Sequence, residues 1–310
     1  MNSDEVKGYL IIILAVLSWS FSEIIVKIVQ GKVGPVTLSF FRFFIGGLFL
    51  LFILLIKRDL SGIIKMIKEN LPLIILSSCF ALGISNVIYF IGVTNTRANI
   101  AATIYTSYPI WVTIYSIFIL NEKTNLRLKF IGIIIGFIGV AILMTNFNLL
   151  EFANSEYFIG NLLVLLGSII WAFYSVLGKV IQLNEPEIEN NAIKFSMISM
   201  FFATIPILIF LPFSSESNII IKFDIEVWFW IIFMGIISTG VGLYLLFAGV
   251  KYIEVSKAFS LAFLKPIFAM LLAYILISEE PTIALYISIM LVTISIILIN
   301  QKRRKIELEK

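Results

Sequence analysis

The chain has 310 residues, of which 60% are hydrophobic and 14% charged, and its formal net charge is +4. Soluble domains are nearer a quarter charged and could not bury so much apolar surface, so the composition indicates an integral membrane protein. There is no histidine and one cysteine, Cys79, which excludes zinc sites of the His or Cys type, histidine general bases and intramolecular disulfides. The charge reflects basic loops rather than nucleic-acid binding, and we expect no metal and no cofactor.

Apolar stretches of about 20 residues follow one another with short connections, and each is long enough to cross a hydrocarbon core of about 30 Å as a helix. In chain order we predict ten spans, at residues 8–28, 35–56, 70–92, 98–120, 126–146, 157–182, 190–212, 226–249, 254–277 and 281–301. Pro35, Pro72 and Pro281 lie near predicted helix starts, where a missing N–H group is harmless. The expected fold is an all-α integral membrane bundle of ten transmembrane helices.

Lys and Arg indicate the orientation, because cytoplasmic loops are enriched in them. With the N-terminus in the cytoplasm, 17 of the 23 Lys and Arg residues fall on the cytoplasmic side. The outer side holds Lys27, Lys32, Arg97 and Lys222, and the spans hold Arg42 and Lys265. We therefore expect a multi-pass protein of the cell (cytoplasmic) membrane with both termini in the cytoplasm.

Residues 92–122 and 249–279 are copies of one another, aligned without a gap at an offset of 157. The matched pairs are Gly92 with Gly249, Ala101 with Ala258, Pro109 with Pro266, and Glu122 with Glu279; at an offset of 152, Trp19 matches Trp171, Lys27 matches Lys179 and Arg42 falls on Lys194. This agreement predicts two five-helix repeats, 1–150 and 151–310. Because five is odd, the second repeat enters the membrane inverted, which is typical of secondary transporters with a substrate site near the midplane.

In these features the sequence resembles the drug/metabolite transporter superfamily, in its ten-helix branch of EamA-type permeases. The resemblance rests on Trp19, Lys27, Arg42 within Phe41–Phe43, Tyr89–Gly92, Pro109 and Glu122, and on Trp171, Lys179, Gly249, Pro266 and Glu279. It covers essentially the whole chain and implies a basket of helices around a central cavity lined by spans 1, 3, 4, 6, 8 and 9, with spans 5 and 10 at the back. Members export amino acids, carry nucleotide-like metabolites or pass drug-like compounds.

Lys265 is the most informative single residue, because it lies near the middle of the predicted span 254–277. A Lys at that depth costs about 2.5–3.5 kcal/mol on insertion scales, so it should face a cavity or a partner. The adjacent Pro266 removes a backbone donor, and Pro109 does the same behind Tyr108. Loosened backbone at mid-depth is where transporters bind substrate, and a Lys that snorkels or pairs structurally is the alternative.

Glu23 is the one carboxylate well inside a predicted span, at a position where relatives commonly carry a neutral polar residue. It is either an intrahelical partner of Lys27, four residues later, or a protonatable coupling residue or a counter-charge to Lys265. Its counterpart in the second repeat is Ser175, so the repeat does not require an acid here.

Polar and aromatic residues on the predicted cavity helices complete the candidate substrate site. They are Trp19, Asn86, Tyr89, Tyr105, Tyr108, Trp171, Tyr174 and Tyr244, alongside Glu23 and Lys265. Aromatic rings with a polar handle bind cations and flat apolar groups, whereas the alternative for each is packing or an interfacial belt. Arg42 is expected to bind an acidic loop residue or a helix end.

Small residues and two acids predict contacts between helices. Gly132 and Gly136 form G-x-x-x-G, and Gly139 continues that face, which we expect to pack against the last helix rather than form a dimer contact. Glu122 and Glu279 end their helices at opposite membrane surfaces, where acids are disfavoured by the helix dipole. We expect both to bind Lys or Arg of neighbours and to be candidate gates.

The sequence thus predicts a secondary transporter of small polar metabolites, with amino acids or related carboxylates as the leading substrate class and export as the direction. Phosphorylated or nucleotide-like metabolites and drug-like compounds are the alternative substrates. An integral membrane enzyme is disfavoured because no cluster of His, Asp or Glu is present, and a receptor is disfavoured by the duplicated halves. The expected partners are a small-molecule substrate, membrane lipid, and protons or a counter-substrate, for a monomer or homodimer.

Overall fold

A computed structural model describes residues 3–29, 31–96, 104–145, 147–148, 155–214, 216, 223–277 and 283–301. Its elements are α1 (Ser3–Val29), α2 (Pro35–Ile56), α3 (Ile63–Ile74), η1 (Ile75–Ile84), α4 (Ser85–Thr94), α6 (Tyr108–Ile119), α7 (Leu126–Thr145), η3 (Ser155–Tyr157), α8 (Phe158–Asn184), α9 (Asn191–Phe210), η4 (Leu211–Phe213), α10 (Ile225–Phe233), η5 (Met234–Val241), α11 (Gly242–Gly249), α12 (Val255–Ser260), η6 (Leu261–Phe263), α13 (Leu264–Ile277) and α14 (Ile283–Asn300). The described residues form helices and their connections, with no strand. The side chains of Glu23, Lys27 and Pro266, and the whole of Glu279, lie outside the described part.

Seven helical stretches among the described residues are long and apolar enough to cross a membrane, and each coincides with a predicted span. The other predicted spans overlap α6, α7 and the run from α12 to α13, so the count of ten remains a prediction. Large apolar side chains cover the outside: Phe118, Ile225 and Ile283 are 79%, 89% and 74% exposed. Such a surface suits lipid rather than water, and the chain is a multi-pass membrane protein.

Two of the membrane-crossing runs contain a π-helical stretch that the sequence did not predict. η1 lies between α3 and α4, and η5 lies between α10 and α11. η1 ends at Ile84 and η5 ends at Val241, which are equivalent residues at the offset of 157. A π-helix adds a residue to the turn and is frequent at functional sites. The two halves therefore share an irregularity of the backbone as well as sequence motifs.

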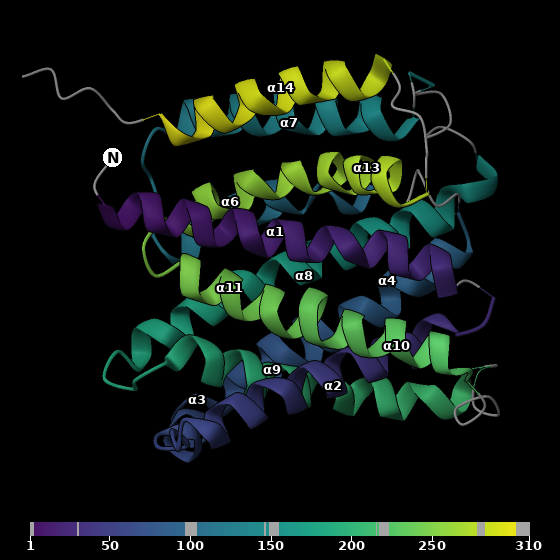
Figure 1. Cartoon of the computed structure of the whole chain (residues 1–310). Coiled ribbons are helices and arrows are strands. Elements are labelled where there is room, and N and C mark those ends of the chain that lie inside the picture. Colours follow the sequence, from purple (N-terminus) through teal and green to yellow (C-terminus); the bar gives the residue numbers. More distant parts are fainter. Residues whose placement is uncertain are drawn as a thin grey trace, which may run out of the picture.

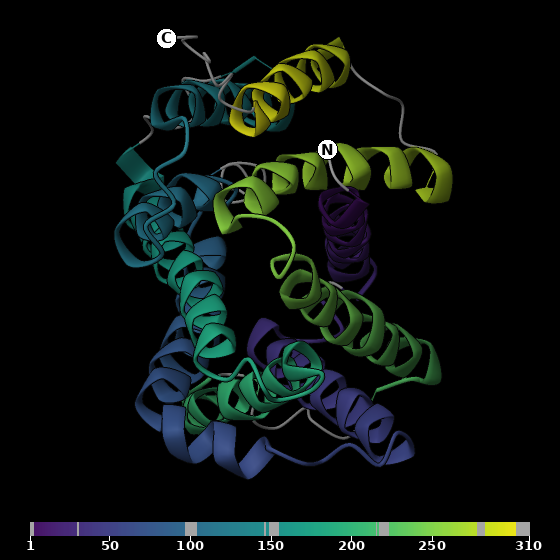
Figure 2. The ribbon, with the colours of Figure 1, turned by 90° about the vertical axis from the view of Figure 1, so that its left-hand side faces the viewer.

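The most extensive contacts between helices join the first half of the chain to the second. α7 and α14 pack side by side as a layer of their own, at the top of both Figure 1 and Figure 2. The remaining contacts come in matched pairs: α4 on α8 matches α11 on α1, α6 on α8 matches α13 on α1, and η1 on α9 matches η5 on α2. In each pair, replacing every helix by its counterpart in the other half turns one contact into the second.

Glycines bring α7 and α14 close together. A Cβ atom at Gly136 would lie 2.5 Å from Ser295 Oγ, and one at Gly132 would lie 2.7 Å from the side chain of Ile299. Both distances are too short for a larger residue, so the backbones can approach only because glycine stands there. The prediction that the G-x-x-x-G face packs internally against the last helix is confirmed.

The connections between helices gather at two opposite faces of the bundle. The N-terminal face carries the start of α1 and the connections 57–62, 120–125, 185–190 and 250–254; the opposite face carries the connection 31–34 and residue 216. On the N-terminal face the fully buried Lys194 contacts Asp59, with 2.5 Å between Nζ and Oδ1. The hydrogen bond from Lys194 holds the pKa of Asp59 below its usual value. On the opposite face Glu216, which corresponds to Asp59, accepts hydrogen bonds from the N–H groups of Val36 and Thr37 at the start of α2.

Candidate functional site

Five of the predicted aromatic residues meet in one cluster between the two halves. Ring centroids lie 6.2 Å apart for Trp19 and Trp171, 4.7 Å for Tyr108 and Trp171, and 4.2 Å for Tyr89 and Tyr105. Tyr105 completes the connection, at 5.9 Å from Tyr108 and 6.2 Å from Trp171. Most of these pairs are edge-to-face or tilted, which is the arrangement that the ring quadrupoles favour. The cluster draws on α1, α4, residue 105, α6 and α8.

Phe259 of α12 belongs to the same cluster, although the sequence did not single it out. Its ring lies 5.9 Å from Tyr108 and 5.8 Å from Trp171. Trp19 is seated closely on the other side, because a Cβ atom at Gly242 would lie 2.6 Å from its Nε1. We call the residues Trp19, Tyr89, Tyr105, Tyr108, Trp171 and Phe259 the aromatic cluster.

Lys265, on α13, is joined by its backbone to the helix that carries Trp19. The hydroxyl of Ser20, the residue after Trp19, lies 2.9 Å from the backbone carbonyl of Val16 and 3.1 Å from that of Lys265, and its one proton is shared between them. This contact fixes α13 against α1 at the depth of the cluster, and the side chain of Lys265 is half-buried. The chain departs from α-helix at both predicted proline breaks: a 3₁₀ segment precedes residue 266, and a turn at 106–107 precedes Pro109 in the first turn of α6.

Asn86, Tyr244 and Arg42 make contacts of other kinds. Asn86 is buried and donates a hydrogen bond from Nδ2 to the carbonyl of Leu82 in η1, at 2.8 Å. Tyr244 is half-buried on α11 and packs against the main hydrophobic core. Arg42 donates a hydrogen bond from Nε to the Thr239 hydroxyl in η5, at 3.2 Å.

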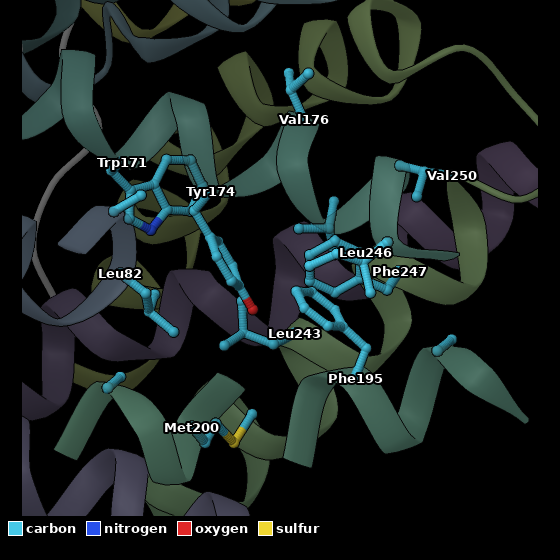
Figure 3. Close-up of a cluster of buried hydrophobic side chains, with 14 of the residues drawn as sticks. Leu82, Trp171, Tyr174, Val176, Phe195, Met200, Leu243, Leu246, Phe247 and Val250 are labelled. Atoms are coloured by element: carbon cyan, nitrogen blue, oxygen red, sulfur yellow. The ribbon is translucent and has the colours of Figure 1, made fainter. Parts of the chain in front are cut away.

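Tyr174 lies in the packed core. Its hydroxyl and that of Ser199 on α9 are 2.8 Å apart, and its ring packs against Phe195 and Phe247. Figure 3 shows the ring reaching from α8 toward the side of α9 that carries Met200. A Cβ atom at Gly178 would lie 2.3 Å from the Phe247 ring, so this glycine makes room for the aromatic packing. The structure thus gives Tyr174 a packing contact where the sequence predicted cavity lining.

Glu122 binds a helix start rather than the Lys or Arg that we expected. Its carboxylate accepts hydrogen bonds from the N–H groups of Val255 and Ser256, at 2.7 and 3.1 Å, and from the Ser256 hydroxyl at 2.8 Å. These N–H groups are at the beginning of α12, where a negative charge is favoured by the unpaired donors and the helix dipole. Glu122 therefore joins the end of α6 to the start of α12 on the N-terminal face. Its counterpart Glu279 lies outside the described residues.

An ion network surrounds the same helix start. Glu254 contacts the fully buried Lys129 at 2.6 Å, Lys257 at 3.2 Å and the Thr124 hydroxyl at 2.9 Å. Burial alone would raise the pKa of Glu254, but the hydrogen bond and charge of Lys129, with Thr124 and Lys257, outweigh it and leave that pKa below its usual value. Nothing near Lys129 in the chain signals a partner 125 residues away.

Within the described ranges no three His, Cys, Asp or Glu side chains group so as to hold a metal ion. The polar groups that the structure does bring together are aromatic hydroxyls and indoles at the cluster, and Lys, Glu and Tyr side chains at the N-terminal face. Such groups bind and orient a small molecule.

The comparisons with known proteins agree with this geometry. The model of the EamA-like transporter family matches residues 6–145 and 158–301. The chain belongs to the EamA-like transporter family. An uncharacterized transporter of Clostridium kluyveri is 27% identical to this chain, and the alignment covers 98% of this chain and 96% of the relative. The uncharacterized transporter YoaV of Bacillus subtilis is also 27% identical, and the alignment covers 97% of this chain and all of the relative. A solved crystal structure with 20% identity has the same fold, with a TM-score of 0.78 over 95% of the EamA-like chain and 96% of its own.

The family match and the related proteins establish the general function of the chain. The EamA-like chain is a membrane transporter and not an enzyme. The relatives share its whole length, and their names give no substrate. The substrate therefore has to be inferred from the residues at the aromatic cluster.

Proposed function

We propose that this transporter exports small metabolites that carry an anionic group on an apolar or flat body, with amino acids and related carboxylates as the substrate class. It works in the cytoplasmic membrane by alternating access, with the N-terminal face and both termini in the cytoplasm. The observation that carries the proposal is the aromatic cluster, which is built from helices of both halves, and the backbone of Lys265 contacts Ser20, the residue after Trp19.

The chemistry of the cluster suits such a substrate. A Lys ammonium attracts a carboxylate as a compact point charge, while Trp19, Tyr108 and Trp171 offer aromatic faces and edges to the apolar remainder. The rings are in contact with one another in this structure. A bound substrate would replace some of these ring–ring contacts by contacts with itself. Because the rings belong to helices of both halves, binding would then be coupled to movement of one half against the other.

Two inverted repeats of five helices, 1–150 and 151–310, would supply the alternating access. The matched pairs of helix contacts and the equivalent π-helical stretches support this arrangement, since exchanging the halves preserves both. Such pseudo-symmetry gives the molecule two interchangeable conformations around one central site. In this scheme Glu122 closes the N-terminal face by holding α6 to α12, and Glu279 is assigned the equivalent gate.

Proton coupling is assigned to Glu23, the one acid well inside a predicted span. Glu23→Gln should transport at a reduced rate and lose the pH dependence of the wild type. An unchanged rate with an unchanged pH profile would assign coupling to a counter-substrate. The transport unit is proposed to be one chain, either as a monomer or within a homodimer.

The test is a ligand screen followed by a flux assay. The purified protein is unfolded thermally in the presence of amino acids, amines, nucleotides and sugar phosphates, and hits are then measured for flux in liposomes. Stabilisation and flux by amino acids or related carboxylates support the proposal. Stabilisation and flux by phosphorylated or drug-like compounds alone would replace the substrate class, and binding without flux would indicate a receptor.

A further inference from the structure

Three residues of α8 form a stripe that leads from the aromatic cluster toward the N-terminal face. At 3.6 residues per turn, Trp171, Ser175 and Gln182 fall within about 40° of one another around the helix axis. Trp171 belongs to the aromatic cluster, and α8 ends at Asn184, where the connection 185–190 begins on the N-terminal face. We call Trp171, Ser175 and Gln182 the α8 stripe.

The polar atoms of Ser175 and Gln182 are buried and unpaired within the part of the chain that the structure describes. The two residues are 1% and 4% exposed, and the Ser175 hydroxyl and both ends of the Gln182 amide have no hydrogen-bond partner there. By contrast, Ser168 on the same helix donates a hydrogen bond to the Leu165 carbonyl at 2.9 Å. Leaving a buried polar atom unpaired is costly, and in native proteins such atoms are satisfied by water or by a ligand.

The neighbours of the α8 stripe show which way it faces. On one side, Gly178 packs against α11, since a Cβ atom there would lie 2.3 Å from the Phe247 ring. On the other side, Lys179 donates a hydrogen bond to the carbonyl of Val250, the residue after α11. Lys179 also lines a cavity of about 310 Å³ on the N-terminal face. The stripe therefore faces the inside of the bundle, between the aromatic cluster and this cavity.

Tyr174 shows the packed face of the same helix for comparison. It is about 60° away from Trp171 around the axis, on the side opposite to Ser175. Its ring packs against Phe195 and Phe247, and its hydroxyl is paired with that of Ser199 on α9 (Figure 3). Packing against neighbouring helices thus pairs the polar atom on that face, whereas three polar atoms of the stripe stay unpaired.

The sequence repeats the pattern of the stripe in the first half of the chain. At the offset of 152 the stripe corresponds to Trp19, Glu23 and Gln30, which are again one aromatic and two polar residues. Polar residues within apolar spans are costly to insert and mark the paths of substrates. In two inverted halves, one such series would lead from the centre to each face, as a pathway that opens alternately to the two sides requires.

We propose that Ser175 and Gln182 line the N-terminal half of the substrate pathway and hydrogen-bond the polar group of the substrate as it passes between the aromatic cluster and the N-terminal face. A hydroxyl and an amide both donate and accept, so they suit the carboxylate as well as the ammonium group of an amino acid. The proposal rests on the proposed function for the substrate, whereas a water-accessible pathway can be measured without one.

The first experiment measures how fast a cysteine at position 175 reacts with a charged, water-borne methanethiosulfonate reagent. The protein is held in nanodiscs, which leave both faces accessible. In a Cys79→Ala background, Ser175→Cys should react at least about ten-fold faster than Ser196→Cys, because a thiolate forms and meets the reagent only where water reaches it. Ser196 is the matched control, since it is equally buried but its hydroxyl donates to the Ala192 carbonyl at 2.8 Å. Equal rates for the two cysteines would overturn the proposal.

Gln182→Leu tests the amide through stability and transport together. Because the amide has no partner in this structure, its removal should leave the thermal midpoint unchanged or raise it. Transport should fall by about 3- to 10-fold in kcat/KM, as for the loss of one hydrogen bond to the substrate. Asn70→Leu is the control: Asn70 is equally buried but is bonded to Glu185 and Asn184, so its midpoint should fall. A similar fall for Gln182→Leu, or normal transport by it, would overturn the role of the amide.

Protection by substrate separates this proposal from the proposed function. A transported compound should slow the reaction of Ser175→Cys and leave that of Ser61→Cys unchanged, since Ser61 is exposed on the N-terminal face. A transported compound that gives no protection would overturn the contact with substrate. Failure to find any transported carboxylate would refute the substrate class alone, because the rates of Ser175→Cys and Ser196→Cys still decide whether the stripe lines a pathway.

Discussion

Single residues at the centre of the bundle have separable electrostatic and packing roles, and Lys265 shows this most directly. Its backbone carbonyl shares the Ser20 proton with that of Val16, and that contact does not depend on the side chain. Lys265→Met should therefore keep the fold while losing the charge. We expect transport of a carboxylate substrate to fall by roughly 10- to 100-fold, since a charge-assisted hydrogen bond contributes about 1.5–3 kcal/mol.

The measurement is liposome uptake together with the thermal midpoint, and Lys57→Met, an exposed lysine after α2, is the control. Normal uptake by Lys265→Met would make Lys265 structural. A variant that does not fold would instead favour a structural ion pair through its side chain, and Lys265→Arg, which keeps the charge, would then report whether transport returns.

Glu254 gives a pH-dependent prediction at the same scale. Its pKa is lower in the folded protein than the ordinary value of 4.5, so its contribution to stability is present above that value and is lost as the pH falls through the folded pKa. Glu254→Gln leaves the buried Lys129 without a counter-charge and should cost about 2–4 kcal/mol near pH 7. The difference from wild type should shrink below about pH 4.5.

Chemical unfolding across pH 4 to 8 checks this, with Glu226→Gln as the control, because its partner Lys32 is exposed and such surface pairs contribute about 0–1 kcal/mol. A difference that stays constant across the whole range would show that the charge of Glu254 is unimportant.

Residue types explain which parts of the candidate site the sequence could predict. Trp19 and Trp171 stand out because large rings with a polar atom recur at equivalent positions of two repeats. Phe259 has no such signal: it is an apolar residue in an apolar run, and its counterpart is Ala102. Tyr174 is a candidate because it falls on a predicted cavity helix, but tertiary packing places α9 against its hydroxyl.

Among the elements, α7 and α14 give the clearest prediction. Gly136→Leu should force the two helices apart, because the first added atom would lie within 2.8 Å of both Ser295 and Phe263. Overpacking of this kind costs about 1–3 kcal/mol and should lower the thermal midpoint by several degrees. Ile134→Leu, on the lipid-facing side of the same helix at 57% exposure, is the matched control and should change little. Equal midpoints for the two variants would contradict the close helix contact.

Elements also mark the limit of what a sequence can predict. Span positions follow from hydropathy because a membrane fixes the length of each apolar run, and the described helices coincide with them. η1 and η5 had no comparable signal, since one extra residue in a turn leaves the apolar composition unchanged. The partner of Glu122 also has no signal in the sequence, because its carboxylate accepts a hydrogen bond from a backbone N–H group of α12, and this contact forms only in the assembled bundle.

For the whole molecule, the orientation in the membrane is the prediction with the widest reach. In a Cys79→Ala background, a cysteine at Ser61 lies on the N-terminal face and one at Lys32 lies on the opposite face, and both positions are exposed. A membrane-impermeant maleimide should label Lys32→Cys on intact cells and Ser61→Cys only after permeabilisation. The excess of Lys and Arg on the N-terminal face is the physical reason. The reverse pattern would place the N-terminal face outside the cell and reverse the proposed direction of transport.

The pairing of α7 with α14 also has a consequence for biosynthesis. α7 ends at Thr145 and α14 ends at Asn300, so the ribosome makes the glycine-lined face of α7 long before its partner exists. At roughly 5–20 residues per second this interval is about 8–30 s. During that time the first half has no second half to pack against, because α2, α4 and α6 likewise wait for α9 and α8. A nascent chain arrested near Thr145 would expose these faces to lipid and to membrane quality control. The helices of the first half therefore reach their final packing only after the second half has been translated.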